Sequence, residues 1–182
     1  MTIEKLREIY KLKCITRYNT KRHLKDESVA EHSFYVALIS LMLCKKYNLD
    51  DKTTMDAVIK ALLHDMPEIE LNDITHDTKE KLNLTPILKV YEDAYYQKYF
   101  PDYATLMINN KGIASTIVDI ADAMSVLQYS DNEQILGNVD TVMQEISDEC
   151  QGRIARNTSK LEAQIKRRDY DKKRSEKKTD NQ

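Results

Sequence analysis

Residues that form tight turns are scarce in this chain of 182 residues, which has three glycines, three prolines and no tryptophan. An all-β fold needs many such residues between its short strands, so their scarcity argues against one. The best apolar run, residues 36–43, ends before Lys45 and is too short to span a membrane as a helix. We therefore expect helices joined by short loops, in a protein without a membrane partner.

Cysteine is also rare, and no Cys-x-x-Cys motif is present. The three cysteines, Cys14, Cys44 and Cys150, are odd in number and far apart in the chain. This usage is typical of a reducing compartment rather than of a disulfide framework. The first ten residues are charged and amphipathic, which is not the pattern of a secretory signal. We therefore expect a cytoplasmic protein.

Excess positive charge is absent from the chain as a whole, whose net charge is −2, so nucleic acid is an unlikely partner. Residues 160–182 nevertheless carry nine Lys or Arg and five Asp or Glu, a net +4, which leaves −6 for the rest. This basic end is either a docking tail or a solvated helix end that becomes disordered, and the second interpretation is favoured. We expect one domain over residues 1–165 and a basic, disordered tail over 166–182.

Apolar residues recur at helical spacing in much of the chain. The segment 29–47 is apolar almost all round, which predicts a central helix buried on every side. Asn48 is its predicted stop, Thr53 or Thr54 is the predicted cap of the next helix, and residues 70–80 look irregular. Helices are expected over residues 2–13, 29–47, 53–65, 84–100, 103–109, 113–130 and 132–165, the last broken near Gly137 or Gly152.

Ionisable side chains interrupt three of these apolar helices. His32 lies in one, the adjacent His64 and Asp65 end a second, and Asp119 and Asp122 share a face of a third. A lone histidine is usually a packed core residue, but buried carboxylates on several helices are costly unless a metal or a partner neutralises them. Two imidazoles and two carboxylates suit one divalent cation such as Mn²⁺, Co²⁺, Fe²⁺ or Mg²⁺. The spacing leaves open whether Asp119 or Asp122 is the second carboxylate.

Glu68 follows His64 by four residues, so a continuing helical turn would place it beside such a cation as a proton donor or acceptor. Arg17 and Lys79 are candidates for contacts with phosphate oxygens. The alternative for each of these residues is an ordinary surface position.

Several short stretches resemble the HD-domain metal-dependent phosphohydrolases, and among them the bacterial 5′-deoxynucleotidases and short viral HD deoxynucleotide hydrolases. These stretches are residues 16–18, 28–33, 61–68, 72–74 and 121–123, within a similar region of about residues 10–130. The family's H…HD…D pattern matches His32, His64, Asp65 and Asp122, which selects Asp122 over Asp119. The resemblance implies an all-α fold, a compact HD-domain bundle of five to seven helices around one divalent metal ion, with cobalt or manganese favoured.

The resemblance also implies a role for other matching residues. Glu68 matches the catalytic carboxylate, and Arg17 and Lys79 match phosphate-binding residues. Tyr18 stands where relatives have a tryptophan beside the nucleotide, and Asp73 matches an aspartate that crowds the 2′ position of the sugar. The expected reaction is hydrolysis of the 5′-phosphate ester of deoxyribonucleoside monophosphates to deoxynucleoside and phosphate, in a dimer or higher homo-oligomer.

The chain departs from the family pattern after Asn72, where Thr75–Thr78 replaces a proline-rich segment. His76 in this segment is a substrate contact, a metal contact or an exposed loop residue, and exposure is favoured. The compact spacing between Asp65 and Asp122 resembles the viral enzymes that hydrolyse deoxynucleoside triphosphates. Lys21, Arg22, His23 and Lys25 are candidates for holding the additional phosphates.

Two further functions are less favoured. A guanosine-tetraphosphate hydrolase resembles a His-Asp-x-x-Glu-Asp pattern, whereas Glu68 is followed here by Ile69. A non-catalytic nucleotide-binding module would have no need of the complete set of metal ligands together with Glu68.

Overall fold

The computed structural model describes residues 3–179 apart from the side chains of residues 4–5, 76–77 and 176–179, and most of these residues are helical. Within these residues the backbone forms no strand, only an isolated antiparallel bridge between Thr16 and Ser28. The all-α class is thereby confirmed. The elements are α1 (Ile3–Tyr10), the 3-10 helix η1 (Lys11–Cys14), α2 (Val29–Lys46), α3 (Asp51–Leu63), α4 (Glu68–Leu71), α5 (His76–Lys81), α6 (Thr85–Tyr99), α7 (Pro101–Ile108), α8 (Ile113–Ile135) and α9 (Thr141–Thr179).

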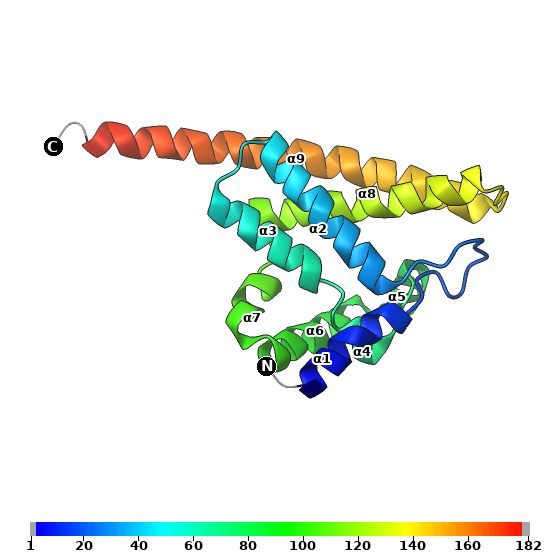
Figure 1. Cartoon of the computed structure of the whole chain (residues 1–182). Helices are drawn as coiled ribbons and strands as arrows, with labels where there is room; N and C mark the ends of the chain where they lie inside the picture. The colour runs from blue at the N-terminus through cyan, green and yellow to red at the C-terminus, as the bar shows by residue number, and fades with distance from the viewer. Residues whose placement is uncertain (1–2, 180–182) are drawn as a thin grey trace.

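Two hydrophobic clusters form the core of the molecule. The first joins α2, α3, α8 and α9 around fully buried residues such as Val36, Ile117 and Leu161. The second lies below it in Figure 1, where η1, α6 and α7 pack against the start of α2 around Val29 and Tyr96. His32, near the start of α2, and His64, which follows α3, lie where the two clusters meet.

Local sequence signals explain the bounds of the helices that carry the site. Ser28 and Glu31 form a reciprocal capping box at the start of α2, which places His32 in its first turns. Asn48 has a φ of 49° and ends that helix, as predicted. The predicted cap of the next helix is wrong, because Asp50 rather than a threonine accepts the Thr53 N–H, at 2.9 Å.

The region from residue 68 to residue 81 is more ordered than the sequence indicates. Pro67 precedes the short helix α4, and α5 forms inside the segment predicted as irregular. Between them Asn72 adopts a φ of 58°, a left-handed value that asparagine tolerates better than most residues. The predicted exposure of the His76 side chain lies outside the described residues.

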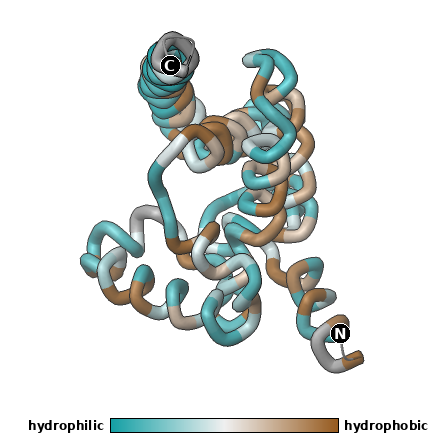
Figure 2. The backbone as a smooth tube through the Cα atoms, turned by 90° about the vertical axis from the view of Figure 1, so that its left-hand side faces the viewer, coloured by the Kyte–Doolittle hydropathy of each residue, from teal (hydrophilic) through white to brown (hydrophobic). Residues whose placement is uncertain are grey.

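The end of the chain differs from the predicted bounds. Helix α8 continues to Ile135, and the turn lies at Gly137, whose φ is 98°, while Gly152 lies inside α9. Helix α9 continues to Thr179 where the sequence predicts disorder from residue 166. Its last part extends beyond the other helices in Figure 1, and Figure 2 looks along it. Packing on the body includes Leu161 and Ile165, and the division into domain and tail stays a prediction.

Helix α2 is not buried on every side, contrary to the sequence-based prediction. Phe34, Leu38, Leu41 and Met42 are 55%, 42%, 47% and 70% exposed and lie at the i, i+4, i+7 and i+8 spacing of one helical face. We call these four residues the α2 face. The prediction failed because a helix that is apolar all round gives no signal of which side meets the core.

None of the helices in the described residues has the length and apolar character needed to cross a membrane.

Candidate active site

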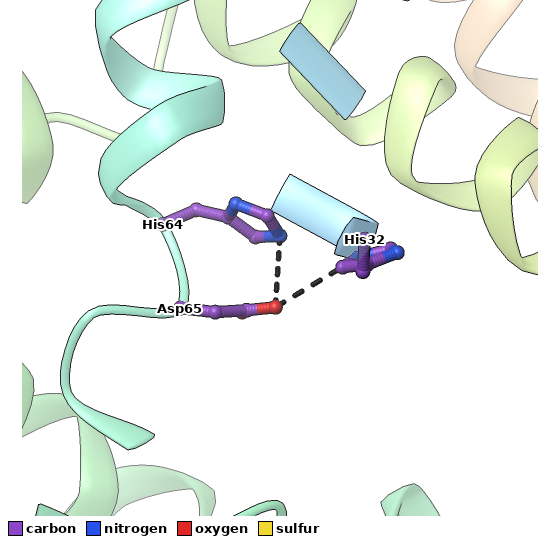
Figure 3. A group of neighbouring side chains, drawn as sticks. All are labelled: His32, His64 and Asp65. Carbon is purple, nitrogen blue, oxygen red and sulfur yellow. Dashed lines mark ion pairs between the residues drawn. The ribbon is translucent and has the colours of Figure 1, made fainter. Parts of the chain in front are cut away.

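Three of the four predicted metal ligands form a tight cluster. One ligand atom from each of His32, His64 and Asp65 lies within 4.8 Å of the others. Figure 3 shows these three side chains and the ion pairs that join Asp65 to both histidines. Asp65 Oδ2 is 3.1 Å from His64 Nε2 and 3.7 Å from His32 Nε2. Asp122 joins the cluster from α8, with its Oδ1 at 3.1 Å from His32 Nε2. The four side chains therefore converge from α2, α8 and the end of α3.

Both histidines present the same nitrogen to the centre of the cluster. His64 Nδ1 is 2.7 Å from the Ala61 carbonyl oxygen, an acceptor, so this nitrogen carries a proton whatever the state of Nε2. His32 Nδ1 is 3.1 Å from Ser125 Oγ. Each Nε2 is buried and has no partner in hydrogen-bonding geometry, although carboxylate oxygens lie nearby. Two such nitrogens beside two carboxylates fit a divalent cation.

The charges of the cluster balance without a cation. The Asp65 charge outweighs burial, which acts in the opposite direction, and raises the pKa of His64 to about 9. The pKa of Asp122 is lowered despite burial because His32, His64 and Arg153 surround it. Arg153, on α9, donates a hydrogen bond of 3.0 Å from Nη2 to Asp122 Oδ2. A cation that binds here therefore displaces a proton from His64.

Neighbouring side chains fix the direction of the His64–Asp65 pair. Helix α3 ends at Leu63, and the Tyr96 hydroxyl donates to the carbonyl oxygens of Leu63 and His64 at 2.9 and 2.7 Å. Lys60, buried on the same helix, donates through Nζ to carbonyl oxygens at the end of α7, including Leu106 at 2.6 Å. A lysine in this position satisfies carbonyl groups that a helix end leaves unpaired.

The remaining predicted site residues line one cavity next to this cluster. Its volume is about 460 Å³, which lies within the range of ligand-binding pockets. The cavity is lined by His64, Asp65 and Asp122 together with Arg17, Tyr18, Glu68, Asp73 and Lys79. Residues that are 105 positions apart in the chain, Arg17 and Asp122, thus face the same space, whereas His32 lies buried beneath it.

Arg17 and Tyr18 are held in place by their backbone and by carboxylates. The Arg17 N–H donates to the Glu27 carbonyl oxygen at 2.9 Å, and its Nη1 donates to Glu27 Oε2 at 3.0 Å. Burial opposes the charge of Arg17, but Tyr18, Asp65 and Glu27 outweigh it, so the pKa stays above its ordinary value. Tyr18 has a φ of 58°, and its N–H donates to Asp73 Oδ2 at 2.9 Å. Arg17, the predicted phosphate contact, and Asp73, the predicted sugar contact, are therefore linked through the backbone of Tyr18.

Glu68 is the first residue of α4, and its Oε2 is buried without a hydrogen-bond partner. Burial raises the pKa of Glu68 to about 9, and the charges of Asp65 and Asp73 act in the same direction. In the cation-free protein this carboxyl group therefore holds a proton at neutral pH, beside a space large enough for substrate.

Other lining residues escaped the sequence-based prediction. Helix α9 forms one side of the cavity, which is lined by Val142, Glu145, Ile146, Glu149, Cys150 and Arg153. The spacing of these positions on one helical face, with an arginine at its end, was the available signal. Of the four candidates for holding additional phosphates, Lys21 lines the cavity and the other three do not. Asp119 lines a separate cavity with Lys60 and Asp122.

The family model described as 5′-deoxynucleotidase YfbR-like matches residues 6–165. The chain belongs to this family. Two curated relatives are similar, each called dATP triphosphohydrolase: one of Acinetobacter phage SH-Ab 15497, 24% identical over 68% of this chain, and one of Salmonella phage PMBT28, 26% identical over 68%. The chain spans only 65% and 64% of the length of these two relatives.

Solved structures with the same fold come from bacteria, archaea and a virus. An HD-domain phosphohydrolase from Listeria innocua has a TM-score of 0.72 at 22% identity, covering 90% of this chain and 83% of that one. A protein from Pyrococcus horikoshii has a TM-score of 0.73 at 23% identity, covering 91% and 99%. The HD phosphohydrolase of cyanophage S-2L, solved with dA and one catalytic zinc ion, has a TM-score of 0.60 at 20% identity, covering 88% and 99%. The HD-domain fold predicted from the resemblance is confirmed.

Proposed function

We propose that the protein is a metal-dependent phosphohydrolase that cleaves the 5′-phosphate ester of deoxyribonucleoside monophosphates. The observation that carries this proposal is the pair of unpartnered Nε2 atoms, beside Asp65 and Asp122, next to a cavity lined by Arg17 and Glu68. Membership in the 5′-deoxynucleotidase family supports the same substrate class.

His32, His64, Asp65 and Asp122 would hold one divalent cation. When bound, the ion supplies positive charge for the phosphoryl oxygens and lowers the pKa of water enough for it to lose a proton at neutral pH. The mixed nitrogen and oxygen donors suit manganese or cobalt, and the zinc ion of the cyanophage neighbour extends the set of ions to test.

The residues that line the cavity have separate roles in the reaction. Arg17 and Lys79 neutralise charge on the phosphate, and Glu68, whose pKa is raised by burial, is placed to give a proton to the 5′ oxygen of the departing deoxynucleoside. Water adds to phosphorus as the P–O5′ bond breaks, and the proton that the water loses restores the Glu68 carboxyl group. The products are deoxynucleoside and phosphate. Asp73, fixed by the Tyr18 N–H, would stand close to the sugar and disfavour a 2′-hydroxyl, as the family resemblance implies.

Hydrolysis of a deoxynucleoside triphosphate is the second candidate, with cleavage at the same ester bond. The names of the two phage relatives favour it, and Lys21 lines the cavity where further phosphates could extend. Both reactions use the same cluster, so the products must separate them.

Product analysis tests both candidates. The purified chain is incubated with each of the four deoxy- and four ribonucleotides, as mono- and triphosphates, with Mn²⁺, Co²⁺, Mg²⁺ or Zn²⁺. Phosphate release from deoxyribonucleoside monophosphates supports our proposal, whereas release of intact triphosphate from deoxynucleoside triphosphates alone would replace it with the second candidate. No release from any nucleotide in the presence of bound metal would reject both.

We further propose that the protein acts as a homo-oligomer in the cytoplasm. The α2 face would pack against a second copy, because it is a continuous apolar stripe without cover in the described chain. The three free cysteines fit a reducing compartment.

A further inference from the structure

We propose that the base of the deoxynucleotide binds against one face of α9 formed by Val142, Ile146 and Cys150, which we call the α9 wall. This inference rests on the proposed function and adds to it the element that recognises the base. All three residues line the same cavity as His64, Asp65 and Asp122.

The position of the α9 wall follows from helix geometry. Its residues are spaced by four, so they lie above one another on one side of the helix, and Arg153 follows three residues later. Arg153 marks the cluster end of the cavity because it contacts Asp122. At the helical rise per residue, Val142 lies about 16 Å further along the axis. The wall therefore leads from the reacting phosphate toward the far end of the cavity.

The lining along α9 differs from that at the cluster, where the metal-ligand and phosphate-binding candidates gather. The α9 wall presents aliphatic groups and a thiol, Glu145 and Glu149 line the cavity beside them, and Val126 of α8 adds another aliphatic side chain. Tyr18 also lines the cavity, and its ring stacks on Tyr129 at 4.8 Å between centroids and 6° between planes, so a second ring supports it. A phosphate placed at the charged end leaves a flat, weakly polar base next to these residues.

A shared anchor holds Tyr18 and the α9 wall in a fixed relation. Glu133 is 1% exposed and accepts the N–H groups of Leu24 and Lys25 at 2.7 and 2.8 Å. Asn138, just before α9, donates through Nδ2 to Glu133 Oε2 at 2.8 Å and to the Arg22 carbonyl oxygen at 3.0 Å. The loop that follows Tyr18 therefore binds both Glu133, near the end of α8, and Asn138, just before α9, which preorganises this end of the cavity.

The test compares nucleotides with a substrate that has no base. We would measure kcat/KM for dAMP, dGMP, dCMP and dTMP and for 2-deoxyribose 5-phosphate in the wild type, Ile146→Trp and Ile146→Ala. The matched control is Gln151→Trp, which adds the same bulk on an exposed part of α9 outside the cavity lining. Ile146→Trp should lower the ratio of nucleotide to base-free turnover about 10- to 100-fold, the order expected from losing a base contact. Gln151→Trp should leave this ratio as in the wild type.

Equal losses for nucleotides and the base-free sugar phosphate in Ile146→Trp would overturn the α9 wall while leaving the proposed function intact. A ratio of nucleotide to base-free turnover that stays at the wild-type value in both Ile146 variants would also overturn the α9 wall. Calorimetric binding of deoxyadenosine, which has no phosphate, provides a second readout that does not need turnover. Loss of this binding in Ile146→Trp but not in Gln151→Trp supports the wall even in a protein that hydrolyses no nucleotide, and that inactivity would reject the proposed function separately.

Discussion

Arg153 hydrogen-bonds only one oxygen of Asp122, at 3.0 Å, so the other oxygen stays turned toward His32. Outer partners of this kind orient metal ligands, and their loss typically costs about 10- to 100-fold in metal affinity. We predict a decrease of this size for Mn²⁺ binding to Arg153→Met, measured by electron paramagnetic resonance. Arg156→Met, an exposed arginine on the same helix, is the control. Unchanged Mn²⁺ affinity in Arg153→Met would show that Asp122 needs no such support.

Replacing Glu68 tests its role in proton transfer. Glu68→Gln keeps the size of the side chain but has no carboxyl proton to transfer, so kcat for the best nucleotide should fall about 10²- to 10⁴-fold. The affinity for Mn²⁺ should change little, because Glu68 is not among the four proposed ligands. Steady-state kinetics and metal titration separate these effects. A variant with normal kcat would contradict the assignment.

Single residues were predictable where their chemistry is unusual for their surroundings. His32, His64, Asp65 and Asp122 interrupt apolar helices, and the structure brings them together. Their supporting residues were not predictable, because a serine such as Ser125 in a helix is ordinary until its partner is known. Arg153 lies 31 positions from Asp122, and no local pattern connects the two.

At the scale of elements, Glu133 connects α8 to the loop that follows Tyr18. Burial opposes its ionisation, yet hydrogen bonds from Asn138, Leu24 and Lys25 outweigh it and lower the pKa of Glu133. We predict that Glu133→Gln loses about 1–3 kcal/mol of unfolding free energy at pH 7, since one strong acceptor is lost. Chemical denaturation measures this loss, with exposed Glu162→Gln as the control.

The pH dependence of the same variant has a defined sign. A lowered folded-state pKa means that ionised Glu133 stabilises the fold at pH values above its unfolded-state pKa of 4.5. This contribution disappears as the pH falls through the folded-state pKa. The stability difference between wild type and Glu133→Gln should therefore shrink below about pH 4.5. A difference that stays constant from pH 7 to pH 3 would mean that the charge of Glu133 does not carry the effect.

Element types were predictable from apolar periodicity, while several bounds were not. The sequence offered two glycines as possible breaks inside the last predicted helix, residues 132–165, and the chain turns at Gly137, where a positive φ is needed. Gly152 is accommodated within α9 because a single glycine costs a helix only about 1 kcal/mol. Tertiary packing of α8 against α9 decided between the two.

At the scale of the whole molecule, the α2 face tests the proposed oligomer. Introducing a charge at Met42, which is 70% exposed, should oppose packing of an apolar stripe against a second copy. We predict that Met42→Glu shifts the solution mass from dimer toward monomer in light scattering coupled to size-exclusion chromatography. Ile135→Glu, 81% exposed at the end of α8, should leave the mass unchanged. A wild-type protein that is monomeric at high micromolar concentration would reject the proposal.

The overall arrangement was predictable as a class, because few turn formers and strong helical periodicity leave few alternatives. The division into two hydrophobic clusters was not, since it depends on which faces of the helices meet. The contribution of α9 to the cavity was missed because it also depends on which helix faces meet. The resemblance gave no help, since it ends near residue 130 and the α9 wall lies beyond that position.

Opposite charges already neutralise one another around Asp65 and Asp122, through His64 and Arg153, before any ion enters. A chelated sample should consequently remain folded, because Asp65 and Asp122 each keep an oppositely charged partner. One preparation can then be reloaded in turn with different divalent ions, and the physiological ion can be sought by exchange on identical protein rather than by comparison between separate purifications.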